Sequence, residues 1–265
     1  MGVYNFMRIK WWLLLGITSV SLIICGITGY EKKMKEDVFI DQSSVLSFQS
    51  PYSSTFNSEA QVYNLSINSY QTLFDECEEV LLVRHTITSL NRGVVQTEAK
   101  VIMIYKSKMN LAIGDELNIF EPIHKKSDKL EIDFSYIPMV KENEYLVFLN
   151  HVDTFQNEKY FNFITPLFGL IPIKDSIKIL DLNYHEGETY MYESIKDYDL
   201  ILWDLTDNLE LIKTQLREDP ENSIIQSELD STLKYKNDQN ELINVISAAY
   251  KNLLNRDLSY QRYSN

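Results

Sequence analysis

The chain has 265 residues and a formal net charge of −13, from 25 basic and 38 acidic side chains. A surface of this sign repels phosphate backbones, which argues against nucleic-acid binding and disfavours broad adhesion to anionic lipid. The hydrophobic fraction of 45% is enough for a packed core, and two cysteines cannot make a disulfide scaffold.

The N-terminal segment has the composition of a membrane anchor. No charged residue occurs between Lys10 and Glu31, and aromatic residues lie at both ends of this interval. As a helix, residues 11–29 would measure about 28 Å, close to the hydrocarbon thickness of about 30 Å. We predict a cytoplasmic head (1–10) and a transmembrane helix (11–30) in the lipid bilayer. The C-terminal domain is then outside the cytoplasm of a bacterial cell.

Two alternatives for this segment stay open. A cleaved secretory signal needs small residues before the cut, but the best cleavage sites here have a bulky Ile at the −3 position. A lipoprotein would carry its lipid on Cys25. Leu22 and Cys25 resemble a bacterial lipobox, and Ile24 departs from it because the peptidase requires a small residue there.

The next segment, residues 31–60, is predicted to be a serine-rich tether, because it contains many serines and little periodicity. The alternative is that its apolar side chains, including Val45, Leu46 and Phe48, pack on the following domain.

A change of pattern near Ser69 predicts the start of a folded domain. Tyr70, Leu73, Phe74 and Cys77 have helical spacing, so they predict a short amphipathic helix in which Cys77 is a packing residue. Apolar and β-branched runs then predict strands at 80–90, 96–106, 115–123, 144–152, 159–173 and 176–182, with a hairpin at the Asn91-Arg92-Gly93 turn.

The strand predicted at 115–123 has an irregular pattern. Leu117 and Ile119 alternate, and Ile123 continues the alternation only after a slip.

The C-terminal region has a helical period. A helix is predicted from Thr206 to just before Pro220, another after a capping box at Ser223, and a third after a looser box at Asp238. Strands followed by helices indicate the α+β class. We therefore predict a β domain at 61–182 and a helical region at 183–265.

Three stretches support a family resemblance. "LFDECEEVLLVRHTI", "KVIMIYKSKMNLAIGDELNIFEP" and "YIPMVKENEYLVFLN" occur in this order within residues 68–165. They resemble a loose group of exported, membrane-anchored bacterial proteins with an OB-like β-barrel. Gly114-Asp115 and the strand "YLVFL" from Tyr145 match, whereas Ser107 and Glu142 replace glycines of the group. The resemblance implies a small OB-like barrel of about five strands and an exported location, and it assigns no active residues.

No motif indicates catalysis. The four histidines have no second histidine at helical spacing, and nucleophile-elbow, Walker and dinucleotide-binding motifs are absent from the sequence. We therefore predict no catalytic residue, metal or cofactor. OB-type barrels often bind ligands across strands two and three. That position predicts a weak basic and aromatic ligand site at Tyr105, Lys106, Lys108, Phe120, His124, Lys125 and Lys126. The alternative is a solvated lysine loop.

These features predict a membrane-tethered, extracytoplasmic binding or interaction module for an unknown protein, peptide or glycan. Two alternatives remain. One is a cell-envelope hydrolase whose site is assembled only in the fold, and the other is a bacteriocin-immunity or export accessory protein. A pocket that joins His85 or His151 to two carboxylates would favour the hydrolase.

Overall fold

The computed structural model describes residues 35–36, 44–49, 67–91, 93–133, 136–152, 159–183 and 189–264. The predicted head (1–10), the predicted transmembrane segment (11–30) and Cys25 lie outside these residues. Of the helices in the described ranges, none combines the length and the apolar character needed to cross a membrane.

The larger sheet contains ten strands within the described residues. They are β1 (Lys35–Glu36), β2 (Val45–Gln49), β3 (Glu79–Asn91), β4 (Val94–Ser107), β5 (Glu116–Lys126), β6 (Lys129–Asp133), β7 (Glu144–Val152), β8 (Tyr160–Phe163), β9 (Leu170–Pro172) and β11 (Thr189–Met191).

Five of these strands pair in a closed order, β3-β4-β5-β8-β7 and back to β3, which we call the strand ring. The β5–β8 pair is parallel, and the other four pairs are antiparallel. The remaining strands extend the sheet beyond the ring: β6 pairs with β5, β2 with β6, β11 with β2, β9 with β7 and β1 with β3.

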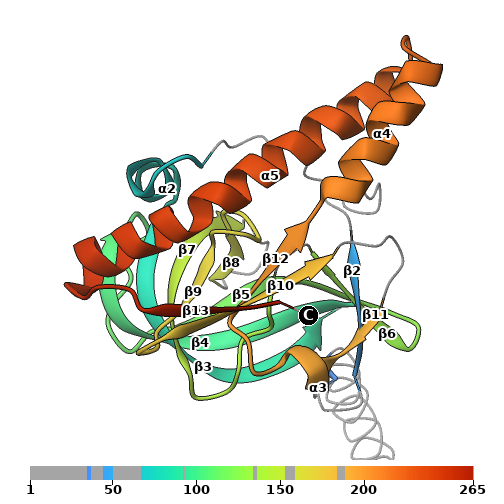
Figure 1. Cartoon of the computed structure of the whole chain (residues 1–265). Coiled ribbons are helices and arrows are strands. Elements are labelled where there is room, and N and C mark those ends of the chain that lie inside the picture. The colour runs from blue at the N-terminus through green and yellow to red at the C-terminus, as the bar shows by residue number, and fades with distance from the viewer. Residues whose placement is uncertain are drawn as a thin grey trace, which may run out of the picture.

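A second, three-stranded sheet is parallel and has the order β12 (Leu200–Asp204), β10 (Ile177–Asn183), β13 (Tyr260–Ser264). The helices are α2 (Tyr70–Glu76), α3 (Tyr192–Ile195), α4 (Thr206–Glu218) and α5 (Ser223–Ala249), followed by the π-helix η3 (Tyr250–Leu254). Figure 1 shows α5 running across one side of the molecule, with α4 against its N-terminal half and both projecting beyond the sheets.

Strand β7 separates two apolar cores. Tyr145, Val147 and Leu149 belong to the core inside the strand ring, whereas Leu146 and Phe148 belong to a second core. The second core also contains buried residues of α2, α5, β10 and β12. Because a strand points alternate side chains to opposite faces, β7 is apolar on both faces and is covered on both.

The predicted architecture is wrong. The chain is mixed α+β and mainly sheet, and the strand ring is one part of a ten-stranded sheet, not a small OB-like barrel of about five strands. The predicted helical C-terminal extension contains β11, β12 and β13, of which β12 and β13 pair in parallel with β10. The predicted transmembrane helix lies outside the described residues, and no helix within them is suited to a membrane span.

Several local predictions are confirmed. The short helix is α2, where the Ser69 side chain accepts a hydrogen bond from the Thr72 amide (3.1 Å), and the predicted hairpin is β3–β4. Leu46 and Phe48 are buried in β2, as the alternative to a pure tether predicted. In contrast, the helices predicted after Ser223 and Asp238 are one continuous helix of 27 residues.

Candidate functional site

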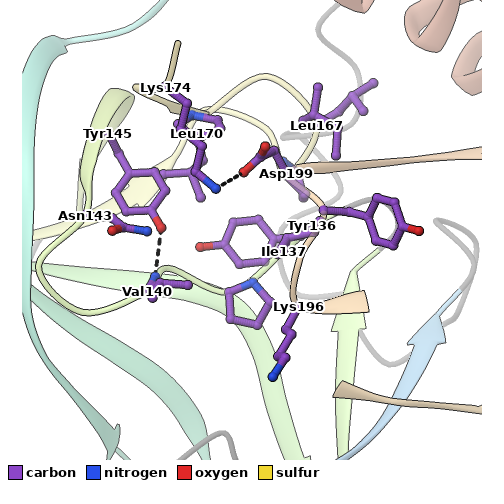
Figure 2. Close-up of a pocket in the computed structure, with 15 residues that line it drawn as sticks. Tyr136, Ile137, Val140, Asn143, Tyr145, Leu167, Leu170, Lys174, Lys196 and Asp199 are labelled. Atoms are coloured by element: carbon purple, nitrogen blue, oxygen red, sulfur yellow. Dashed lines mark hydrogen bonds and ion pairs between the residues drawn. The ribbon is translucent and has the colours of Figure 1, made fainter. Parts of the chain in front are cut away.

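The candidate site is a small pocket where three separate segments meet (Figure 2). Residues 136–143 come from the connection between β6 and β7, and Tyr145 lies at the start of β7. Residues 166–174 surround β9, and residues 196–200 lead into β12. Three tyrosines, three prolines and several aliphatic side chains form its walls. Its volume is about 30 Å³, which is room for water or the tip of one side chain.

Charged groups lie at the edge of this apolar pocket. The Lys174 ammonium is 2.5 Å from the Asp199 carboxylate, whose other oxygen accepts a hydrogen bond from the Lys178 amide (2.9 Å). The Lys196 ammonium contacts Glu193 (2.7 Å), and this pair is partly exposed. Exposed pairs are weak, so a ligand carboxylate can replace Glu193 at little energetic cost.

Residues 136–143 form a strap that is one wall of the pocket. The Val140 amide donates to the Tyr145 hydroxyl (2.8 Å), which Figure 2 shows as a dashed line. The His85 amide donates to the Asn143 carbonyl, and the Glu142 amide donates to the His85 carbonyl (both 3.1 Å). Glu142 has a φ of 66°, a conformation that favours glycine. These bonds fix the strap against β3 and β7.

The opposite wall is held by the second core. The Tyr250 hydroxyl of η3 donates to the Pro172 carbonyl (2.5 Å) and accepts from the Lys174 amide (3.2 Å). A Cβ at Gly169 would lie 2.5 Å from the Phe163 Cβ and 2.6 Å from the Thr165 carbonyl oxygen, so this close turn requires glycine. Both contacts position the residues around β9 that line the pocket.

A buried carboxylate lies directly behind the strap. Glu121 is 2% exposed and accepts hydrogen bonds from the Thr97 hydroxyl, the Tyr136 hydroxyl (2.9 Å) and the Met139 amide (3.2 Å). Burial raises the pKa of Glu121, and the three hydrogen bonds oppose that shift because they favour the carboxylate. Tyr136 both lines the pocket and contacts Glu121, so the carboxylate positions the pocket wall.

The hydrogen bonds continue from Glu121 to β3. The Thr97 and Thr88 hydroxyls are 3.4 Å apart, and the Thr88 hydroxyl is 2.6 Å from the His85 Nε2 atom. Burial, and secondarily the charge of Lys141, lowers the pKa of His85 to about 4. The buried Nδ1 atom of His85 has no hydrogen-bond partner among the described residues. We call His85, Thr88, Thr97, Glu121 and Tyr136 the buried polar network.

The structure divides the predicted ligand residues into two groups. The β4–β5 register places Val94 opposite His124, whereas Lys106 lies at the other end of β4, opposite Val80 of β3. Along β4, Lys106 is twelve residues from Val94, which corresponds to about 40 Å of strand. The predicted ligand residues near Lys106 and those near His124 therefore cannot form one small site. One group is Tyr105, Lys106 and Lys108, and the other is Phe120, His124, Lys125 and Lys126.

Several of these predicted residues make contacts within the protein. The Lys106 ammonium donates to the carbonyls of Phe74 (2.7 Å) and Asp75 (2.9 Å) at the end of α2. The remaining contacts that bear on the site are Lys108 with Glu78 (2.6 Å), Lys126 with Glu131 (2.9 Å) and the Phe120 ring stacked on Tyr160 (5.2 Å). Ligand binding by either group stays a prediction.

The sequence-based prediction did not include the buried polar network, although the sequence contains a signal for it. Leu117, Ile119, Glu121 and Ile123 are buried in strict alternation along β5. The apparent break in the alternation is Glu121, an acidic residue at an inward-facing position of the strand. A buried acidic side chain needs hydrogen-bond donors, so its position alone predicts polar partners inside the sheet.

Neither the free cysteine nor any cluster of metal-ligating side chains in the described residues adds a reactive site. Cys77 is buried, its thiol donates to the Phe74 carbonyl (3.4 Å), and burial raises its pKa to about 12. It is therefore a packing residue, as predicted. Within the described ranges, no group of three or more His, Cys, Asp or Glu side chains is arranged to hold a metal ion.

No protein-family model matches the chain, and no curated protein matches it. Its function must therefore be inferred from the geometry of the site and from the sequence.

Proposed function

We propose that this protein is a binding module that recognises another protein through the pocket between the strap, β9 and β12. The observation that carries the proposal is the combination of apolar, aromatic and proline-rich walls with a volume of only about 30 Å³. Small-molecule sites measure roughly 300–1,000 Å³, whereas protein interfaces insert single anchor side chains into small pockets.

The pocket also indicates which partner chemistry fits. The tip of an aliphatic anchor complements the walls, and a carboxylate beside the anchor can pair with Lys196 at the rim. The proposed ligand is therefore a polypeptide segment with an apolar residue next to an acidic one.

A peptide-display experiment tests this proposal. We expect a random peptide library, panned on the full chain in lipid nanodiscs, to enrich apolar–acidic sequences. The substitution Lys196→Glu should weaken binding of the enriched peptides at least tenfold, because it places a negative charge at the rim beside the acidic residue of the peptide. Affinity is measured by fluorescence polarisation.

Lys213→Glu is the matched control, because Lys213 also pairs with a glutamate three residues away but lies on α4, outside the pocket. It should change affinity less than twofold. Equal weakening by both substitutions, or enrichment of peptides without this pattern, would contradict the proposal.

We further propose that the module acts at a bacterial membrane, outside the cytoplasm, and is attached through its apolar N-terminal residues. The sequence supports this, because no charge occurs between Lys10 and Glu31. We expect the full chain to sediment with membranes and to be cleaved by protease added to intact cells. Removal of residues 1–30 should leave it soluble.

The mass of the membrane-bound chain distinguishes attachment by the intact segment from a lipid on Cys25. Protection of residues 67–264 from external protease would contradict the proposed side of the membrane.

The hydrolase alternative requires a pocket that contains His85 or His151. His85 is buried inside the strand ring, and neither histidine lines the pocket. An immunity or export accessory protein would use the same surface and would differ only in the identity of its partner.

A further inference from the structure

The strand β13, red in Figure 1, is an open edge of the three-stranded sheet. Among the described strands it pairs with β10 alone, and all five of its residues are exposed. The Ile177 amide donates to the Ser259 carbonyl (2.9 Å), which fixes the backbone groups that face β10. By alternation, the backbone amides and carbonyls of Tyr260, Arg262 and Ser264 face away from β10, and no described residue bonds to them. They form a row of unpaired donors and acceptors at the surface.

The opposite edge of the same sheet is closed. There the Trp203 amide of β12 donates to the Gln239 side chain (2.7 Å), whose amide group donates to the Trp203 carbonyl (3.2 Å). A side chain of α5 thus takes the place of a neighbouring strand at β12, whereas no residue in the described part of the chain does so at β13. The contrast identifies β13 as the edge that is open to another chain.

The strand β13 also lacks the features that usually protect an exposed edge. Such edges have a proline, a bulge or an outward-pointing charge. The register of β13 with β10 is unbroken over five residues, and the strand contains no proline. Its one charged residue, Arg262, donates two hydrogen bonds to Asp181 of β10 (3.0 and 2.6 Å), so its charge is directed away from the open edge. An extended polypeptide can therefore pair with β13 without meeting a charge or a missing amide.

The open edge is continuous with the pocket. The Tyr263 ring packs edge-on against the Tyr198 ring, with centroids 5.5 Å apart, and Tyr198 lines the pocket. Three extended residues span about 10 Å, nearly twice the distance between these centroids. A polypeptide with its anchor in the pocket can therefore reach β13 by passing this pair of rings.

We propose that the partner segment continues from the pocket as an added antiparallel β-strand on the open edge of β13. This inference rests on the function proposed above and adds the mode of binding. Main-chain hydrogen bonds to Tyr260, Arg262 and Ser264 contribute affinity, as they do wherever a peptide extends a sheet. An antiparallel strand starts opposite Ser264, so the anchor, which lies near Tyr263, precedes the strand in the partner. The partner therefore has an apolar–acidic anchor, a short spacer and about five residues of high β-propensity.

N-methylated peptides test the added strand, because a methyl group on an amide nitrogen removes a main-chain donor and leaves the side chains unchanged. The probe is a fluorescein-labelled peptide with a leucine–aspartate pair, a glycine–serine–glycine spacer and three threonine–valine repeats. The full chain in nanodiscs should bind it. Methylation of one alternating set of amides, the threonines or the valines, should weaken binding at least tenfold. Methylation of the other set should weaken it less than threefold, because only alternate amides of an added strand face β13.

A pair of substitutions at Arg262 tests the same contact from the side of the protein. Arg262→Pro removes the outward amide of β13 and the contact with Asp181, whereas Arg262→Ala, the matched control, removes only that contact. Proline should weaken binding of the probe at least tenfold relative to alanine. The pairing of β13 with β10 does not use this amide, so an edge strand tolerates the proline, and circular dichroism confirms that the fold is retained.

Equal weakening by the two methylated sets, no weakening by either, or failure of the probe to bind would overturn the added strand. Lys196→Glu separates this inference from the proposal for the pocket. If Lys196→Glu weakens binding while both methylated peptides bind normally, the pocket proposal stands and the added strand is wrong. If methylation matters and Lys196→Glu does not, only the pocket is contradicted. A monomer–dimer equilibrium that Arg262→Pro abolishes in sedimentation velocity would also overturn the inference, because a second copy would then occupy the edge.

Discussion

Replacing Glu121 with leucine should lower the free energy of unfolding by about 3 kcal/mol or more. Leucine is of similar size but removes both acceptor oxygens from a fully buried site. The Tyr136 hydroxyl and the Met139 amide, which now donate to one oxygen of Glu121, would be left without an acceptor. Each unsatisfied buried donor costs about 1–3 kcal/mol. Urea unfolding followed by circular dichroism measures the change.

The matched control is Glu121→Gln. A glutamine oxygen can accept from Tyr136 and Met139 while its amide group donates to the Thr97 hydroxyl, so every partner is satisfied without a buried charge. We expect a stability within about 1 kcal/mol of the wild type at neutral pH. Hydrogen exchange at Met139 and Val140 should be faster in the leucine variant only. Wild-type stability of the leucine variant would contradict a structural role for the network.

The sequence predicts local elements well where short-range patterns decide them. The helix α2 combines helical spacing with a serine cap, and Gly93 allows the positive φ of the β3–β4 turn. Both features depend on residues that are neighbours in the chain. The hairpin and the helix could therefore be placed without knowledge of their tertiary contacts.

Prediction failed where tertiary contacts override local signals. Asp238 resembles a helix cap, yet α5 continues through it because Gln239 binds β12: its side chain accepts from the Trp203 amide (2.7 Å) and donates to the Trp203 carbonyl (3.2 Å). The strand β13 is exposed along its length, so it has no hydrophobic alternation. Its pairing with β10 and the contact of Arg262 with Asp181 (2.6 Å) hold it in place.

The candidate site was not predictable for a related reason. The pocket is assembled from segments near Val140, Leu170 and Tyr198, which contain no shared motif and meet only in the fold. The predicted ligand residues followed the order of strands in a resembling family. That order gives no information about where each residue lies along a long strand. Lys106 is accordingly near one end of β4, whereas His124 of β5 pairs with Val94 at the other end of β4.

Acidification should destabilise the protein through His85, and His85→Gln should remove this effect. In the folded protein the pKa of His85 is about 4, below the ordinary value of 6.5, because burial disfavours the charged imidazolium. The unfolded chain therefore takes up a proton between pH 6.5 and pH 4 that the folded chain does not. Stability is lost as the pH falls through this window, by up to about 3 kcal/mol for this residue. Unfolding free energies at several pH values measure the slope.

Glu121 contributes a pH dependence of stability opposite in sign to that of His85, so the two contributions can be measured separately. The pKa of Glu121 in the folded protein is raised above the ordinary value of 4.5, so above pH 4.5 the folded chain keeps a proton that the unfolded chain loses. The stability contributed by Glu121 therefore falls as the pH rises from 4.5 to the folded pKa. Glu121→Gln should therefore steepen the acid-induced loss of stability, His85→Gln should reduce it, and the double variant should lack both contributions. The same pH slope in His85→Gln and wild type would show that His85 is not the titrating group.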